Sequence, residues 1–383
     1  MGRCCILNNG GGLGCAAPST GMDYRNRQKR LLQSREIANW DAFLVTHLPN
    51  VRYLCGFSGS SGVLALSSAG PVFFTDGRYT EQARAEVAGA RVLISRKSAA
   101  VAAAEWLRRR GSARTPLMVG IESEHLSVAA RALLMRLLSP RARLRHTAGV
   151  VERLRMVKDE EELRRMKAAA RLGDSLLAGA LRKIRPGVAE TALAAELEYA
   201  ARQGGAEEMS FPTIVAAGPR SALPHARASA HAVPRHGFVL FDFGVILAGY
   251  CSDMTRTVYV GRPTAEARRI YQAVLEAQLA AIAAVRPGAA VGEVDRAARN
   301  VLRRARLGRY FTHSTGHGVG LEIHEPPRVA GGQPERLQPG MVITVEPGVY
   351  LAGRGGVRIE DMVVVTGSGC EVLTSARKEM IVL

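Results

Sequence analysis

The sequence predicts a mixed α/β protein built from two units, and three observations support this fold class. Residues 22–150 alternate short apolar runs with helical segments, and residues 151–383 contain one helix-plus-hairpin unit twice. The chain has 383 residues and is 47% hydrophobic, enough to build more than one domain with a sizeable core. No apolar run reaches the length of a membrane span, so we expect no transmembrane helix.

Residues 1–21 are expected to be a disordered tail, or sequence upstream of a start at Met22. They contain no apolar core of signal-peptide length. From residue 22 to residue 150, apolar runs at 42–45, 62–66 and 72–74 predict strands. Residues 79–87 and 101–109 predict helices.

The second unit, 151–383, is expected to open with a long helix. Asp159 is a suitable N-cap because acidic residues follow it, and the helix should end near Arg182. The chain then repeats itself, because I-R-P-G at 184–187 and V-R-P-G at 285–288 each open a predicted helix. A Gly-led apolar strand with a carboxylate follows each helix.

Each repeat supplies two acidic residues on apolar strands. Asp242 and Asp253 belong to the first repeat, and Glu346 and Glu360 belong to the second. A turn near Leu247-Ala248 would place Asp242 opposite Asp253. Like charges in that position are destabilising, and an unpaired buried carboxylate costs more. The sequence therefore predicts cations between the carboxylates.

These acids and a histidine predict a metal site. His317 lies in a Gly-rich segment, and carboxylates with an imidazole suit Mn²⁺, Co²⁺ or Zn²⁺. Four carboxylates are too many for one small cation, whereas two cations about 3.5–4 Å apart can share them. Each acid alone has an ordinary explanation, such as a turn aspartate or a surface ion pair. The repeat favours the metal site because it supplies matched acids in both halves.

Cysteine content and charge limit the other classes of protein. The six cysteines form no C-x-x-C pair, which favours a reduced, cytoplasmic setting. The formal net charge of +18 could suit a nucleic-acid partner. However, the arginines are scattered and few aromatic residues lie among them, so nucleic-acid binding is not favoured.

Five segments of the second unit together carry a family resemblance. They are Leu223-Pro224-His225, Asp242 with Asp253, His313 to Glu325, Thr344 to Gly348, and Gly356 to Asp361. These segments resemble the M24 family of pita-bread metallopeptidases, and more narrowly its Xaa-Pro aminopeptidase (aminopeptidase P) and Xaa-Pro dipeptidase (prolidase) branch. Residues 50–60 and 75–79 resemble the creatinase-type N-terminal domain. The resemblance covers nearly everything from Met22 onward.

The resemblance implies a dinuclear site and its surroundings. It implies two divalent ions, most often Mn²⁺, with Co²⁺ or Zn²⁺ as alternatives. Glu346 would also move a proton as general base and then acid. Arg358 lies two residues before Glu360 and could hold that carboxylate from the same face of a strand. The implied ligands are Asp242, Asp253, His317, Glu346 and Glu360. The implied substrate-site residues are His225, His313 and His324, with Arg358 supporting the site from behind.

The resemblance leaves several functions open. The N-terminal segments favour an Xaa-Pro aminopeptidase that acts on a proline-containing peptide, with prolidase as the alternative. Methionine aminopeptidases usually lack the N-terminal domain, and creatinase lacks the metal ligands. A non-catalytic binding module of the same fold is a third possibility. A homodimer is expected by symmetry and by resemblance.

Overall fold

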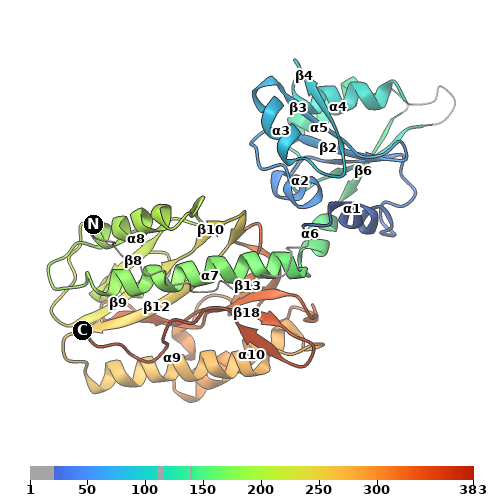
Figure 1. Cartoon of the computed structure of the whole chain (residues 1–383). Coiled ribbons are helices and arrows are strands. Elements are labelled where there is room, and N and C mark those ends of the chain that lie inside the picture. Colours follow the sequence, from blue (N-terminus) through green and yellow to red (C-terminus); the bar gives the residue numbers. More distant parts are fainter. Residues whose placement is uncertain (1–20, 111–115, 139, 141) are drawn as a thin grey trace, which may run out of the picture.

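The computed structural model describes residues 21–110, 116–138, 140 and 142–383. They form two units, with helix α6 (Val150–Arg155) between them (Figure 1). The tail predicted at residues 1–21 lies outside the described part of the chain, apart from Gly21. Within the described ranges, no helix combines the length and the apolar character needed to cross a membrane.

The N-terminal unit is one six-stranded sheet with helices on both faces. Its elements are α1 (Tyr24–Leu32), β1 (Ala42–Val45), α2 (Leu48–Cys55), β2 (Val63–Ser67), β3 (Val72–Asp76), the 3₁₀ turn η1 (Gly77–Tyr79), α3 (Thr80–Glu86), β4 (Arg91–Ser95), α4 (Ala99–Arg108), β5 (Met118–Glu122), α5 (Val128–Leu137) and β6 (Arg143–Thr147). The strand order is β4-β3-β2-β1-β5-β6.

Strand β1 shows why this sheet is covered on both faces. Phe43 and Val45 pack in one apolar cluster with residues of α1 and α2. Ala42 and Leu44 pack in another with residues of α4 and α5. A strand buried on both sides has a continuous apolar run, as residues 42–45 do. The strands predicted at 42–45, 62–66 and 72–74 are confirmed as β1, β2 and β3.

The C-terminal unit contains two half-domains with similar connections. Its elements are α7 (Glu160–Leu181), α8 (Glu190–Gln203), β7 (Glu208–Met209), β8 (Ile214–Ala217), η2 (Gly218–Ala222), β9 (Gly237–Phe243), β10 (Val245–Leu247), β11 (Tyr250–Cys251), β12 (Met254–Val260), α9 (Ala265–Ala284), α10 (Val291–Arg304), η3 (Gly308–Tyr310), β13 (Gly316–Gly318), β14 (Glu325–Val329), β15 (Val342–Val345), β16 (Gly348–Leu351), β17 (Gly355–Arg358), β18 (Asp361–Val365) and β19 (Cys370–Val372).

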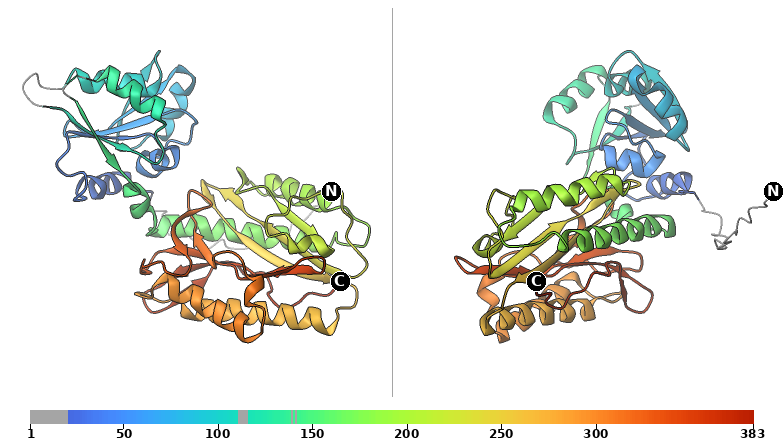
Figure 2. Two further views of the ribbon diagram at one scale, coloured as in Figure 1. Left: turned by 180° about the vertical axis from the view of Figure 1, so that it is seen from behind. Right: turned by 60° about the vertical axis from the view of Figure 1, so that its left-hand side comes forward.

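The strands of this unit lie between two helical layers. Figures 1 and 2 show α7 and α8 on one side of the strands and α9 and α10 on the other. The sheet β12-β9-β8 shares an apolar core with α7 and α8. The sheet β14-β13-β15-β18-β19 shares one with α9 and α10. The internal repeat predicts these two similar halves, and the arrangement agrees with the pita-bread fold that the family resemblance implies.

Two helix starts differ from the sequence prediction. The long helix begins as predicted, because Asp159 and Glu162 form a reciprocal capping box at the start of α7. In contrast, α8 and α10 begin at Glu190 and Val291, not at the I-R-P-G and V-R-P-G segments. Gly187 and Gly288 have φ values of 91° and 79°. A left-handed glycine belongs to a turn, so each helix starts after it.

The acidic hairpin differs from its predicted register. Its turn is at Ala248-Gly249, with φ values of 50° and 85°, which suits a two-residue type I′ turn. Asp242 therefore pairs with Thr255, and the prediction that it lies directly opposite Asp253 is wrong. The register differs by two residues, so Asp253 remains on the same face, diagonal to Asp242.

Candidate metal centre

The five predicted ligands come from strand ends of both half-domains. Asp242 lies in β9, and Asp253 immediately precedes β12. His317 lies in β13, Glu346 immediately follows β15, and Glu360 immediately precedes β18. Positions at strand ends let polar side chains face a cavity while the neighbouring apolar residues stay in the core.

All nine residues predicted for the site line one cavity of about 800 Å³. The wall also contains apolar side chains, among them Phe211, Ile214 and Pro327. A largely apolar cavity with a few converging polar groups is typical of a small-molecule site. The nine are Asp242, Asp253, His317, Glu346, Glu360, His225, His313, His324 and Arg358.

His317 points one nitrogen at the carboxylates. Its Nδ1 lies 3.0 Å from the carbonyl oxygen of Gly318, so Nδ1 carries the proton and Nε2 keeps a lone pair. Nε2 lies 3.5 Å from Asp253 Oδ2 and 3.6 Å from Glu346 Oε1. Asp253, His317 and Glu360 each offer a ligand atom within 4.8 Å of the others. Burial lowers the pKa of His317 to about 4, which keeps the imidazole neutral, as a ligand must be.

The carboxylates fit divalent cations because two of their oxygens have no other partner. Asp242 Oδ1 and Asp253 Oδ1 are buried and accept no hydrogen bond from a described residue. Burial, and then the nearby Glu360, raise the pKa of Asp253 well above its ordinary value. Burial raises the pKa of Glu346 to about 7. A cation among these groups would satisfy the orphaned oxygens and relieve the repulsion.

Arg358 contacts a different carboxylate from the one predicted. Its Nη2 donates to Asp242 Oδ2, across the boundary between the half-domains. It reaches Glu360 only through Thr255, which accepts from Arg358 Nε at 3.1 Å and donates to Glu360 Oε2 at 2.6 Å. The prediction of a direct bond to Glu360 is wrong, because Glu360 has left the strand that contains Arg358.

Tyr350 is a site residue that the sequence analysis missed. Its hydroxyl lies 2.6 Å from Arg358 Nη1 and 2.8 Å from His313 Nε2. Because His313 Nδ1 lies 2.8 Å from the carbonyl of Ser314, Nδ1 donates there and Nε2 accepts from Tyr350. Burial raises the pKa of Tyr350 to about 12, and burial with Arg358 lowers that of His313 to about 4. Tyr350 could be assigned to the site only from the β16–β17 register, because that pairing brings it next to Arg358.

His225 and His324 are exposed at the cavity wall. The ring of His324 meets that of His317 edge-on, with centroids 4.4 Å apart. Burial, followed by the nearby His225, lowers the pKa of His324. His324 is therefore a neutral imidazole at the boundary between the ligand set and the open part of the cavity.

The cavity wall is joined to the N-terminal unit by buried ion pairs, which the sequence analysis also missed. Glu325 lies on the wall and is 2.5 Å from Arg155 and 2.7 Å from Lys158. Arg155, at the end of α6, also pairs with Glu322 at 2.8 Å. The loop between β13 and β14 is thereby held to the segment that links the two units.

Comparison with known proteins matches each of the two units to a protein family. The model of Metallopeptidase family M24 matches residues 164–367, and that of the Creatinase/Prolidase N-terminal domain matches residues 27–157. A solved Xaa-Pro dipeptidase from Bacillus anthracis is 39% identical, with a TM-score of 0.90 over 94% of this chain and 100% of that chain. The X-Pro aminopeptidase from Thermotoga maritima MSB8 is 34% identical, with a TM-score of 0.85 over 93% and 100%. An Xaa-Pro dipeptidase of Pyrococcus horikoshii is 34% identical over 94% of this chain and 100% of its own length.

Proposed function

This chain belongs to metallopeptidase family M24, and we propose that it is an Xaa-Pro dipeptidase, which hydrolyses the bond between a first residue and a C-terminal proline. The sequence analysis favoured an Xaa-Pro aminopeptidase. Dipeptidases predominate among the similar proteins whose names give an activity, which favours the alternative. The observation that carries the proposal is the cavity that joins the ligand set to an exposed arginine.

We propose Asp242, Asp253, His317, Glu346 and Glu360 as ligands of two divalent ions, with Mn²⁺ as the first choice. Support comes from the two orphaned carboxylate oxygens and from the neutral imidazole directed at them. Such ions, when bound, lower the pKa of water and polarise a carbonyl group.

The protein's own residues would position the substrate and move protons. Glu346 is a carboxylate that faces the cavity beside the other ligands, so it would take a proton and return one to the proline nitrogen. Both ring nitrogens of His313 are engaged, with Ser314 and Tyr350. We therefore propose His324 as the donor to the oxyanion that develops on the substrate carbonyl. His313, Tyr350 and Arg358 would hold the ligand Asp242 in place.

Arg328 explains how a dipeptide could be selected. It alternates with buried residues along β14 and is the cross-strand neighbour of His317, so its exposed side chain reaches the cavity near the ligand set. Among the described residues, it is within ion-pair distance of no carboxylate. We propose that it binds the free carboxylate of an Xaa-Pro dipeptide. A longer peptide has no carboxylate at that position.

Competing substrates test the proposal directly. The Mn²⁺-loaded protein is given Ala-Pro, Ala-Pro-Ala and Ala-Ala-Ala together, and the mixture is followed by mass spectrometry. We expect loss of Ala-Pro alone. Release of Pro-Ala from Ala-Pro-Ala would instead indicate an aminopeptidase. Survival of all three peptides in a protein that holds its metal would contradict the proposed dipeptidase activity, and loss of Ala-Ala-Ala would contradict proline specificity. An Asp253→Ala sample prepared in parallel detects contaminating peptidases.

Two further expectations stay predictions. One is the homodimer, and the other is a reducing cytoplasmic setting. Cys55, Cys251 and Cys370 have free thiols, and burial raises the pKa of Cys55 and of Cys251 to about 12, so these two thiols are unreactive at neutral pH. Cys4, Cys5 and Cys15 lie outside the described residues.

A further inference from the structure

We propose that His47, His125 and Glu152 form a third divalent-metal site, suited to Zn²⁺, where the N-terminal unit meets the rest of the chain. None of the three lines the peptidase cavity. Each offers a ligand atom within 4.8 Å of the other two. The site is thus separate from the centre that holds Asp253 and Glu360, and its ligand set contains more nitrogen.

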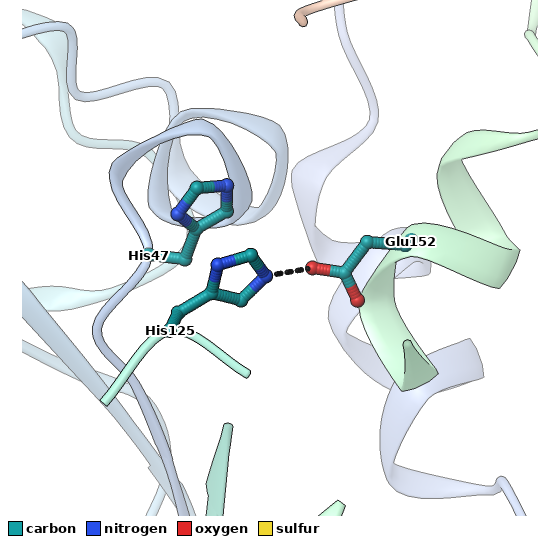
Figure 3. A group of neighbouring side chains, drawn as sticks. All are labelled: His47, His125 and Glu152. Atoms are coloured by element: carbon teal, nitrogen blue, oxygen red, sulfur yellow. Dashed lines mark hydrogen bonds and ion pairs between the residues drawn. The ribbon is translucent and has the colours of Figure 1, made fainter. Parts of the chain in front are cut away.

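The three side chains converge from different elements (Figure 3). His47 immediately precedes α2, His125 follows β5, and Glu152 lies in α6. His125 Nε2 is 3.0 Å from Glu152 Oε1. The imidazole rings of His47 and His125 stack with centroids 3.6 Å apart and an interplanar angle of 9°. The stack holds the two imidazoles side by side, next to the carboxylate of Glu152.

Glu322, which lies outside this group of three, is the candidate for a fourth ligand from the C-terminal unit. Its Oε1 lies 3.0 Å from His47 Nε2. Ligands on a tetrahedral Zn²⁺ with bonds of about 2.0–2.1 Å are roughly 3.3–3.4 Å apart. The two hydrogen-bonded nitrogen–oxygen pairs, His47 with Glu322 and His125 with Glu152, are each 3.0 Å apart and so are close to that spacing. Two imidazoles and two carboxylates balance the charge of the ion and leave the site neutral.

Neighbouring groups already orient both carboxylates. Asn50 Nδ2 donates to Glu152 Oε1 at 2.5 Å. Arg155 Nη1 donates to Glu322 Oε2 at 2.8 Å, on the oxygen that does not face His47. Hydrogen bonds of this kind fix the direction of ligands in protein metal sites. Asn50 and Arg155 are buried, so these supports are rigid.

One ring must tilt when the ion binds. An ion lies in the plane of each imidazole that ligates it, and two parallel rings have no common plane. His47 and His125 have side-chain exposures of 19% and 26%, so rotation about the bond to the ring is open to them.

A bound ion would connect three parts of the chain. It would tie the N-terminal unit and α6 to the loop that contains Glu322, and this loop also contains the cavity residues Ile323 and His324. We therefore expect metal occupancy here to raise the melting temperature and to restrict the loop, without supplying a reacting group.

Metal stoichiometry tests the proposal. Metal-free protein is dialysed against Zn²⁺ and its metal content is measured by mass spectrometry. We expect one more equivalent per chain in the wild type than in the double variant His47→Gln, His125→Gln. Glutamine can keep the hydrogen bonds to Glu322 and Glu152 but is a poor Zn²⁺ ligand. The control is His146→Gln, an exposed histidine of the same unit outside the cluster, which should bind as much as the wild type.

Cobalt gives a second readout that does not depend on activity. Tetrahedral Co²⁺ absorbs visible light more strongly than six-coordinate Co²⁺, so the wild type should show a band that the double variant lacks. Equal stoichiometry and equal spectra in the two proteins would overturn the proposal. The stacked pair would then be a hydrogen-bonded contact alone. Peptidase activity, which uses neither histidine, shows that the variant is folded and separates this result from a failure of the proposed function.

Discussion

Arg358 and Asp242 form a buried ion pair inside the proposed metal centre, although they belong to different half-domains. The guanidinium also donates to Thr255 and Tyr350. We expect Arg358→Lys to lower kcat and metal affinity by about 10- to 100-fold, because lysine cannot make this forked set of bonds. Kinetics and metal titration measure both effects. The control is Arg354→Lys, at an exposed arginine paired with Glu266.

Asp253→Ala should abolish metal binding and nearly all activity. Its carboxylate lies in the ligand cluster with His317 and Glu360, and its Oδ1 accepts no hydrogen bond from any residue that the structure describes. Metal analysis after gel filtration, together with Ala-Pro hydrolysis, checks both expectations. Glu276→Ala, at an exposed residue of α9, serves as the control. Full activity of Asp253→Ala would remove it from the ligand set.

The His324→Ala variant should retain its bound metal but have a lower kcat. If His324 stabilises the oxyanion, removing it should reduce kcat by about 10²- to 10³-fold. Steady-state kinetics should be measured beside metal content, with the exposed His231→Ala as a control. Unchanged kcat would exclude His324 from the mechanism, and lost metal would assign it to the centre instead.

Arg328→Gln should raise KM for Ala-Pro by about 10- to 100-fold, because a charge-assisted bond to the substrate carboxylate is worth about 1.5–3 kcal/mol. Ala-Pro amide lacks that carboxylate and should be little affected by the substitution. Arg227→Gln, at the other exposed arginine of the cavity wall, is the matched control. An equal rise in KM for Ala-Pro and for Ala-Pro amide would show that Arg328 does not bind the substrate carboxylate.

The metal-free protein should lose stability as pH rises from about 6.5 to 8, where His313 and His317, whose pKa values are lowered, are largely neutral in both states. The pKa of Glu346 is raised to about 7 in the folded state, against an ordinary value near 4.5. The folded state then binds more protons than the unfolded state in this window, so its stability declines as pH increases. Thermal unfolding in EDTA across this range measures the effect. Excess Mn²⁺ should diminish it, and a flat profile in EDTA would contradict the raised pKa.

The fold and the ligand set could be read largely from the sequence because their signals are local. Strand β1 is a continuous apolar run, and Asp159 and Glu162 form a capping pair. The internal repeat places two acidic residues on the corresponding strands of each half of the C-terminal unit. The nine predicted residues line one cavity for this reason. Their roles remain to be tested by the substitutions above.

The parts that the sequence did not predict depend on register and on contacts between distant segments. One residue of difference in the turn moved the partner of Asp242 from Asp253 to Thr255. The place of Tyr350 between His313 and Arg358 follows from the β16–β17 pairing. The ion pairs of Arg155 with the β13–β14 loop need the two units in place. No local pattern encodes these relationships.

The division of the ligands between two hairpins bears on how the protein is made. During translation, Asp242 and Asp253 are added to the chain well before Glu346 and Glu360. A nascent chain that ends after β12 can form the first sheet, yet it has only one side of the proposed centre. Loading with metal therefore has to follow synthesis of the last sheet, and a prematurely terminated product would be unable to keep ions.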